Sequence, residues 1–232
     1  LFAKILYRIW LLILGLYSKG TPYDRTIFFK KRIQKKGLKI IRDYNINNVI
    51  VTGAPFRLCY YFALIKVNIP NFIVDFRDPW TWSEGGYGYN NLSEKKTKFE
   101  KKMEAYVIKH ADTVFSPVEI MNKELSNLYP NSIEKFKVLT HGFDAENIPV
   151  RKAPLLENKK TIKLIFIGTL YDGIGNLFSE IARAISDENT DITIDFFSSS
   201  TKYFDLFKLN KTSKMKVIYH SPVAPKKLFE LI

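Results

Sequence analysis

The sequence predicts an α/β fold with two successive domains, each built on a doubly wound parallel β-sheet. Short apolar runs alternate with longer helical stretches from Asn48 onward, and this alternation calls for a parallel sheet with helices on both faces. A polar, Pro-containing stretch interrupts the alternation, which then restarts, as expected of a linker between domains. A hydrophobic content of 46% excludes a disordered chain. We therefore expect a first domain at 1–145, a linker at 146–160 and the start of a second domain at 161–232.

Four apolar runs in the first domain have the length and the flanking turn residues of strands. They lie at 49–51, 72–76, 112–116 and 136–140. Helices are expected at 25–42, 56–67, 94–109 and 117–128, with Ser93 as the N-cap of the third and Pro117 in the first turn of the fourth. Strands and helices thus alternate along the chain, which predicts parallel strands.

The second domain repeats this alternation in a shorter segment. Strands are expected at 162–167, 192–197 and 215–219, and helices at 176–185 and 202–209, with a further helix beginning at Pro225. The chain begins at Leu1 rather than Met, and its last residues have the pattern of a helix still in progress. We therefore expect a fragment of a longer protein.

The N-terminal segment joins an apolar helix to a strongly basic one. Residues 1–17 are mostly apolar, but their uninterrupted apolar run covers only Ile9 to Leu16, far less than a bilayer span needs. Such a helix suits a membrane interface, and a buried core helix is the alternative. The net charge is +13, and residues 1–45 hold eleven Lys and Arg against two Asp. Because no nucleic-acid motif accompanies this charge, we expect an anionic membrane surface as partner, and no nucleic acid.

Residues that commonly bind metals or form disulfides are few and scattered. Cys59 is the single cysteine and lies in an apolar helical stretch, which fits a packed thiol in a reduced, cytoplasmic setting. His110, His141 and His220 are far apart in the sequence, so we expect no metal site. No G-x-S-x-G hydrolase motif is present.

A cluster of charge follows the strand at 72–76. Asp75, Arg77 and Asp78 lie where this strand ends. Ligands of open α/β sheets bind at the carboxyl ends of the strands, so these side chains are candidates for contacting a polar substrate. The alternative is an ion pair that braces the Gly- and Tyr-rich loop at 81–91.

Two later strand ends also carry candidate residues. The loop Gly168 to Gly175 lies between a strand and a helix, where backbone N–H groups and the helix dipole can hold phosphate. Its spacing matches neither G-x-G-x-x-G nor a P-loop, and a turn eased by glycine is the alternative. His141, Gly142 and Asp144 follow the strand at 136–140, where His141 is placed either to donate to an anion or to cap a turn.

Five segments follow one another along the chain in a distinctive order. They are Ile69-Pro70 through Asp75-Phe76-Arg77-Asp78-Pro79-Trp80, then Lys109-His110-Ala111-Asp112-Thr113-Val114, the helix at Ser116-Pro117, Lys137-Val138-Leu139-Thr140-His141-Gly142-Phe143-Asp144, and Leu164-Ile165-Phe166-Ile167-Gly168-Thr169-Leu170-Tyr171. In this succession the chain resembles bacterial family 4 glycosyltransferases of the GT-B fold. The resemblance implies two Rossmann-like domains, both incomplete here. The acceptor domain would lack its first strand and glycine-rich loop, and the nucleotide-sugar domain would end before its donor-binding part.

The resemblance also implies a reaction and a site. The reaction is retaining transfer of a sugar from a nucleoside diphosphate sugar to an acceptor hydroxyl, with no metal and no cofactor besides the nucleotide sugar as substrate. Charge develops on the departing diphosphate, so fixed donors around it matter most. The implied residues are Asp75, Arg77 and Asp78 as catalytic; Gly168, Thr169, Leu170, Tyr171 and Gly173 near the donor phosphates; and Thr52, Gly53, Pro55, Trp80, His141, Gly142 and Asp144 along the cleft and acceptor side.

Two departures from the family pattern concern the diphosphate. The family's Gly-Arg-Leu reads Gly168-Thr169-Leu170 here, and no Arg or Lys occupies 172–176. The usual cationic ligands are therefore not found where the family has them.

Three functions are carried forward from the sequence. The first is a glycosyltransferase that acts in the cytoplasm, peripherally on the inner face of the cell membrane, with a sugar, polysaccharide or lipid-linked acceptor. The second is a sugar-nucleotide epimerase of the same architecture. The third is a non-catalytic domain that binds a nucleotide sugar or a partner protein.

Overall fold

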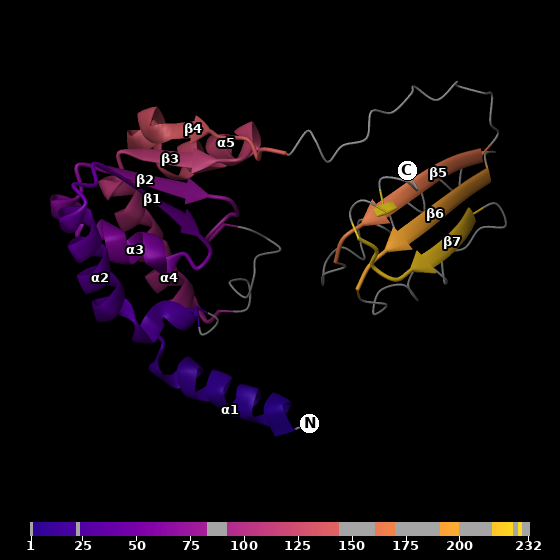
Figure 1. Ribbon diagram of the computed structural model, residues 1–232, viewed down its shortest axis with the longest axis horizontal. Helices are drawn as coiled ribbons and strands as arrows, with labels where there is room; N and C mark the ends of the chain where they lie inside the picture. The colour runs from indigo at the N-terminus through magenta and orange to yellow at the C-terminus, as the bar shows by residue number, and fades with distance from the viewer. Residues whose placement is uncertain are drawn as a thin grey trace. The chain divides into compact units, whose positions relative to one another are not determined.

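A computed structural model gives the structure of the chain in two compact units, Leu1–Gly142 and Phe143–Ile232, and each is described by itself (Figure 1). The structure describes residues 2–21, 24–82, 92–143, 161–169, 191–199, 215–224 and 227–228.

The first unit contains a four-stranded parallel sheet. Its strands are β1 (Asn48–Gly53), β2 (Asn71–Phe76), β3 (Thr113–Ser116) and β4 (Phe136–Val138), in the order β1-β2-β3-β4. All four predicted strands of this region are present, although the last is shorter than expected. Because the strands are parallel, their carboxyl ends share one edge of the sheet, toward which the arrowheads of Figure 1 point.

Helices of the first unit precede the sheet or connect its strands. They are α1 (Phe2–Tyr17), α2 (Lys30–Asp43), α3 (Arg57–Ala63), α4 (Glu94–His110) and α5 (Glu119–Leu128), with short 3-10 helices η1 (Arg25–Phe28), η2 (Lys66–Asn68) and η3 (Pro130–Lys135). The predicted helix at 25–42 is therefore divided at Phe29, and α5 begins two residues after Pro117. Ser93 has the extended backbone of an N-cap, but its side chain makes no capping hydrogen bond.

One face of the first sheet packs against helices. Alternate residues of β2 (Phe72, Val74 and Phe76) are buried, as period-2 geometry requires, and they share a core with residues of α3, α4 and α5, among them Cys59, Met103 and Leu125. On the opposite face, Ile50 of β1 is 63% exposed. The core therefore lies between the sheet and one layer of helices.

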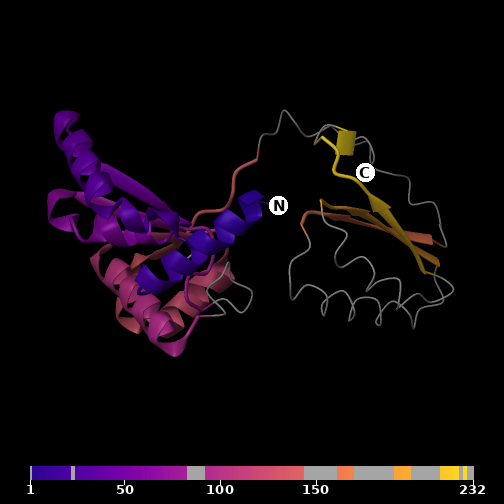
Figure 2. The same cartoon turned by 90° about the horizontal axis from the view of Figure 1, so that it is seen from below.

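Helix α1 leaves most of its apolar side chains in solvent. Leu14 is buried, whereas Leu12 is 70% exposed and Leu16 is 85% exposed. The buried-core-helix alternative for this segment is therefore wrong. Figure 2 shows α1 from below the view of Figure 1. Among the helices that the structure describes, none combines the length and the apolar character that a membrane crossing needs.

The second unit contains a three-stranded parallel sheet. It consists of β5 (Thr161–Ile167), β6 (Asp191–Phe197) and β7 (Met215–His220), in the order β5-β6-β7. These strands match the predicted ones to within a residue at each end. The helices predicted at 176–185 and 202–209 and the helix start at Pro225 lie outside the described residues. With two all-parallel sheets, the predicted α/β fold class is confirmed. In the first unit, the described helices that share the core with the sheet, α3, α4 and α5, lie on one of its faces and not on both as predicted.

Candidate functional site

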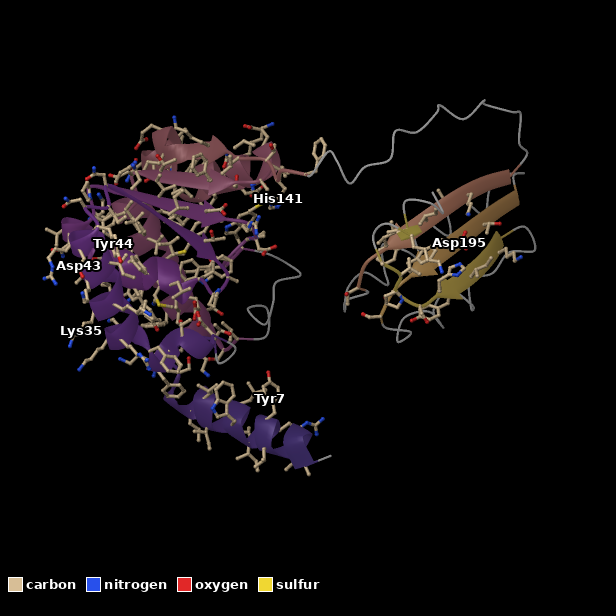
Figure 3. All side chains as sticks on the ribbon, in the orientation of Figure 1. Tyr7, Lys35, Asp43, Tyr44, His141 and Asp195 are labelled. Atoms are coloured by element: carbon tan, nitrogen blue, oxygen red, sulfur yellow. The ribbon has the colours of Figure 1, made fainter. Side chains whose placement is uncertain are left out.

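Four polar side chains meet at the carboxyl edge of the first sheet. Thr52 Oγ1 donates a hydrogen bond to Asp75 Oδ2 over 3.3 Å, and Arg77 Nε lies 3.8 Å from the same carboxylate oxygen. Arg77 Nη2 donates to His141 Nδ1 over 3.4 Å, and Figure 3 labels His141 at this edge. The sequence predicted all four as site residues, and the structure brings them together. We call them the strand-end cluster.

Strand pairing explains how the cluster forms. Thr52 of β1 is the register partner of Asp75 of β2, so both side chains leave the same face, while Val51 and Val74 are buried on the other face. The exposed fractions of the Asp75 and Arg77 side chains are 19% and 55%. Because the pair is partly in solvent, it contributes little to stability and is accessible to a ligand.

The end of β1 passes directly over a buried ring of the core. A Cβ on Gly53 would lie 2.5 Å from a ring carbon of Phe56, so only glycine fits above this buried ring. The peptide bonds on either side of Ala54 are both cis. Gly53 thus has a packing role in the structure, and the acceptor-side role of Gly53 and Pro55 stays a prediction.

The structure corrects the predicted position of Trp80. Its side chain has no exposed surface and stacks on Phe56 at 5.1 Å between ring centroids, and Nε1 donates to Glu100 Oε2 over 3.0 Å. An indole in the core removes a large apolar area from water while its N–H finds an acceptor, so Trp80 does not line a cleft. Asp78 is half-buried, and no hydrogen bond or ion pair within the described ranges joins it to the strand-end cluster.

At the strand ends of the second unit, the structure describes two of the predicted donor-side residues, Gly168 and Thr169. Gly168 has a φ of +145°, which favours glycine, and its N–H donates to Phe197 O over 3.1 Å. This N–H is therefore used within the sheet instead of being offered to a phosphate. Thr169 is exposed. The remaining predicted positions, Leu170, Tyr171, Gly173 and Asp144, lie outside the described residues.

An aspartate in the middle of β6 was not singled out from the sequence. Asp195 is buried, its Oδ1 lies 2.6 Å from His220 Nε2, and its Oδ2 lies 3.6 Å from Lys163 Nζ. The His220 ring stacks on Phe197 at 4.5 Å between centroids. A carboxylate flanked by apolar residues, Ile194 before it and Phe196 after it, was the signal available in β6.

A second missed feature is a buried polar cluster where the N-terminal segment meets α3 and α4. Arg57 Nη2 lies 3.2 Å from Glu100 Oε1 and donates to Ser18 Oγ over 2.9 Å. The Thr21 N–H donates to the same Glu100 oxygen over 2.7 Å, and the Arg57 N–H donates to Asp24 Oδ2 over 3.1 Å. All five residues are buried, so this buried polar cluster attaches the N-terminal segment to the core.

A second buried carboxylate on α4 contacts the start of the loop after β2. Glu104 Oε2 accepts hydrogen bonds from the hydroxyls of Thr81 and Tyr129, while Oε1 has no partner. Burial raises the pKa of Glu104 to about 7, and the Thr81 and Tyr129 hydrogen bonds counter this only in part. Burial and the neighbouring Glu104 carboxylate also raise the pKa of the Tyr129 hydroxyl.

Potential metal ligands do not gather in the part of the chain that the structure describes. No group of three or more His, Cys, Asp or Glu side chains there has an arrangement suited to a metal ion. Cys59 is buried, and burial strongly raises the pKa of its thiol, so the thiol is not activated as a nucleophile.

Comparison with known proteins gives similarity to solved structures only. No protein-family model matches the sequence, and no curated protein matches it. The accessory secretory protein 1, 2 and 3 structure of Streptococcus pneumoniae aligns with 88% of this chain and 39% of its own, at 11% identity and a TM-score of 0.46. The UDP-GlcNAc 2-epimerase of Methanocaldococcus jannaschii aligns with 87% of this chain and 58% of its own, at 15% identity and a TM-score of 0.43. The chain thus spans about half the length of the structures it resembles.

Proposed function

We propose that this chain is part of a glycosyltransferase that moves a sugar from a nucleotide sugar to an acceptor hydroxyl. The strand-end cluster is the observation that carries the proposal. It places a carboxylate, a guanidinium, an imidazole and a hydroxyl at the carboxyl edge of a parallel sheet, which is where ligands of open α/β sheets bind.

The alternative of a structural loop brace is weakened by where the bracing contacts lie. The described start of the loop is held by Glu100, through the Trp80 indole, and by Glu104, through the Thr81 hydroxyl. Arg77 instead contacts Asp75 and His141. Within the described residues, the charged groups of the strand-end cluster contact one another and Thr52, and not the residues at which the loop begins.

The chemistry of the cluster suits an acceptor with hydroxyl and phosphate groups. Asp75 Oδ2 can accept a hydrogen bond from a sugar hydroxyl and orient it for attack on the donor sugar. Arg77 and His141 can donate to an anionic group such as the phosphate of a lipid-linked acceptor.

The test is an assay of the intact protein that contains this chain, with radiolabelled UDP, GDP and dTDP sugars and an extract of membrane lipids. We expect label to move from the nucleotide to a lipid or saccharide acceptor. Asp75→Asn and Arg77→Ala should lower this transfer by about 100-fold, as removal of well-placed charged donors and acceptors does elsewhere. Arg42→Ala is the matched control, because Arg42 is 79% exposed and lies on α2, and it should leave the rate unchanged.

Two outcomes would replace the proposal. An epimerised free nucleotide sugar that forms without any acceptor would identify an epimerase. No turnover of any donor, together with no nucleotide binding by calorimetry, would indicate a non-catalytic domain, in line with the absence of Arg and Lys at 172–176.

A further inference from the structure

Helix α1 and the amino-terminal part of α4 together form a surface that carries exposed apolar side chains and lysines. On α1, Ile5, Leu6, Ile9, Leu12 and Leu16 are each at least 47% exposed. An apolar patch of this kind on a protein surface marks an interaction site. Figures 1 and 2 show α1 as an extension of the first unit, joined to it at the carboxyl end of the helix.

A cleft of about 580 Å³ lies where α1 meets α4. Its lining includes Leu16 and Phe99 together with Lys19, Lys95, Lys98 and Lys102. These four lysines are exposed, and no carboxylate of the described residues lies within ion-pair distance of them. We call this feature the lysine cleft. It is large enough for a phosphate-bearing headgroup and carries the opposite charge.

The apolar patch and the lysine cleft are continuous. Leu16, which is 85% exposed, belongs to both, and Lys19 follows it just after the end of α1. We infer that this surface binds an anionic phospholipid bilayer, with α1 lying in the interface and the lysine cleft receiving a lipid headgroup. Interfacial helices combine an apolar face with basic residues in this way, and each Lys near an anionic surface adds to the attraction.

A second copy of the chain is a poorer occupant of this surface. In a two-fold dimer the same patch faces itself, so two sets of lysines would be brought together and repel. A nucleic acid would satisfy the lysines but leave the leucines and isoleucines of α1 without an apolar partner. The inference does not depend on the transferase activity.

Vesicle co-sedimentation of the full 232-residue chain tests the inference. Vesicles of equal parts phosphatidylcholine and phosphatidylglycerol should bind the chain about tenfold or more tightly than pure phosphatidylcholine, and salt should weaken the binding. The variant Lys95→Gln/Lys98→Gln/Lys102→Gln should lose about tenfold or more on the anionic vesicles only. The variant Leu12→Gln/Leu16→Gln should weaken binding to both, with an unchanged circular dichroism spectrum because both side chains are exposed.

A charge-matched control variant distinguishes the contribution of the lysine cleft to vesicle binding from that of the overall positive charge of the chain. Lys31→Gln/Lys35→Gln/Lys36→Gln removes the same charge from α2, where all three lysines are exposed and where Figure 3 places Lys35 well away from Tyr7 of α1. This variant should lose no more than about twofold. Equal losses in the two triple variants would overturn the inference.

Quenching by lipids with brominated acyl chains gives a second, independent measurement. Trp10 lies on α1, whereas Trp80 is buried in the core and Trp82 is half-buried in the first unit, so quenching should occur on binding and be largely lost in Trp10→Phe. Three results would reject the inference: no quenching, lysine-dependent binding to DNA without binding to vesicles, or a dimer that is lost in the Leu12→Gln/Leu16→Gln variant.

Discussion

Arg57 and Glu100 form an ion pair that is closed to solvent. Arg57 Nη2 lies 3.2 Å from Glu100 Oε1, and the exposed fractions of the two side chains are 4% and 1%. Glu100 also accepts hydrogen bonds from the Thr21 N–H and the Trp80 indole N–H. The charge of the carboxylate is thus compensated by one guanidinium and two neutral donors, as a buried carboxylate requires.

Removal of one member of this pair should destabilise the chain strongly. We expect Arg57→Met and Glu100→Gln each to lower the free energy of unfolding by about 3–5 kcal/mol, because each leaves its partner buried and unpaired. The double variant should cost less than the sum of the two single variants. Urea denaturation of all four proteins measures this coupling.

The exposed pair of Lys39 and Asp43 on α2 is the control for that experiment. The Lys39 side chain is 68% exposed, so Lys39→Met should change the free energy of unfolding by no more than about 0.5 kcal/mol. Equal effects of Arg57→Met and Lys39→Met would show that the Arg57 ion pair is not closed to solvent.

The two neighbouring tryptophans should respond differently to loss of the indole N–H. Trp80→Phe removes a donor to Glu100 and a buried ring volume, so we expect a loss of about 2–4 kcal/mol. Trp82 Nε1 is buried without a partner, so Trp82→Phe also removes an unsatisfied donor, and we expect a change below about 1 kcal/mol. Thermal unfolding of the two variants compares them, and a larger loss for Trp82→Phe would contradict the assignment of the hydrogen bonds.

Two glycines provide another matched comparison. A Cβ on Gly20 would lie 1.9 Å from Glu100 Oε1 and 2.8 Å from Arg57 Nη2, whereas a Cβ on Gly142 meets nothing within 4 Å. Gly20→Ala should therefore displace the buried ion pair and cost about 2 kcal/mol or more, and Gly142→Ala should stay within about 0.5 kcal/mol of the parent. Chemical denaturation measures both variants. An unchanged free energy of unfolding in Gly20→Ala would show that the buried polar cluster can accommodate a methyl group.

Because the pKa of Glu104 is raised, we expect the stability of the chain to depend on pH between about 4.5 and 7, above the pH range in which an ordinary carboxyl group titrates. In the unfolded chain this carboxyl has a pKa near 4.5, whereas in the folded chain the pKa is raised to about 7. Between these values the folded state binds more protons than the unfolded state, so the free energy of unfolding falls as pH rises. The full effect is about 3–3.5 kcal/mol, reached above pH 7.

Glu104→Gln isolates this contribution. The amide oxygen still accepts from Thr81 and Tyr129 but carries no charge at any pH, so we expect this variant to lose the decline and to be more stable than the parent at pH 8. Glu119→Gln, on the exposed first turn of α5, should keep the decline of the parent. Urea denaturation from pH 5 to pH 8 measures all three, and parallel pH profiles for the parent and Glu104→Gln would refute the raised pKa.

The strands and most of the helices could be predicted because local pattern determines them. The apolar run Phe72-Ile73-Val74 followed by Asp75 predicted a strand with polar residues at its end, and the register of β1 with β2 then placed Thr52 beside Asp75. The strand-end cluster was therefore accessible to sequence reasoning, because parallel strands bring their carboxyl ends to one edge.

The buried polar cluster was not predicted, because its members are distant in sequence and each is surrounded by ordinary-looking neighbours. Glu100 lies on a helix rich in exposed lysines, so its carboxylate was expected to be exposed as well. A signal was nevertheless present. Glu100, Met103, Glu104 and Val107 follow the i, i+3, i+4, i+7 spacing of a buried helical face, which places two carboxylates where apolar residues are expected. Trp80 was misplaced for the related reason that its acceptor is Glu100, twenty residues away.

The hydrogen bond from Thr21 to Glu100 also has a consequence for the order of events during synthesis. The two residues are 79 positions apart, so the N-terminal segment leaves the ribosome long before its acceptor exists. Arg57 is also synthesised before its ion-pair partner Glu100. Because a domain emerges from its N-terminus onward, the contacts of the N-terminal segment with Glu100 cannot form until α4 has been made, and during that interval the leucines and isoleucines of α1 are free to meet another surface first.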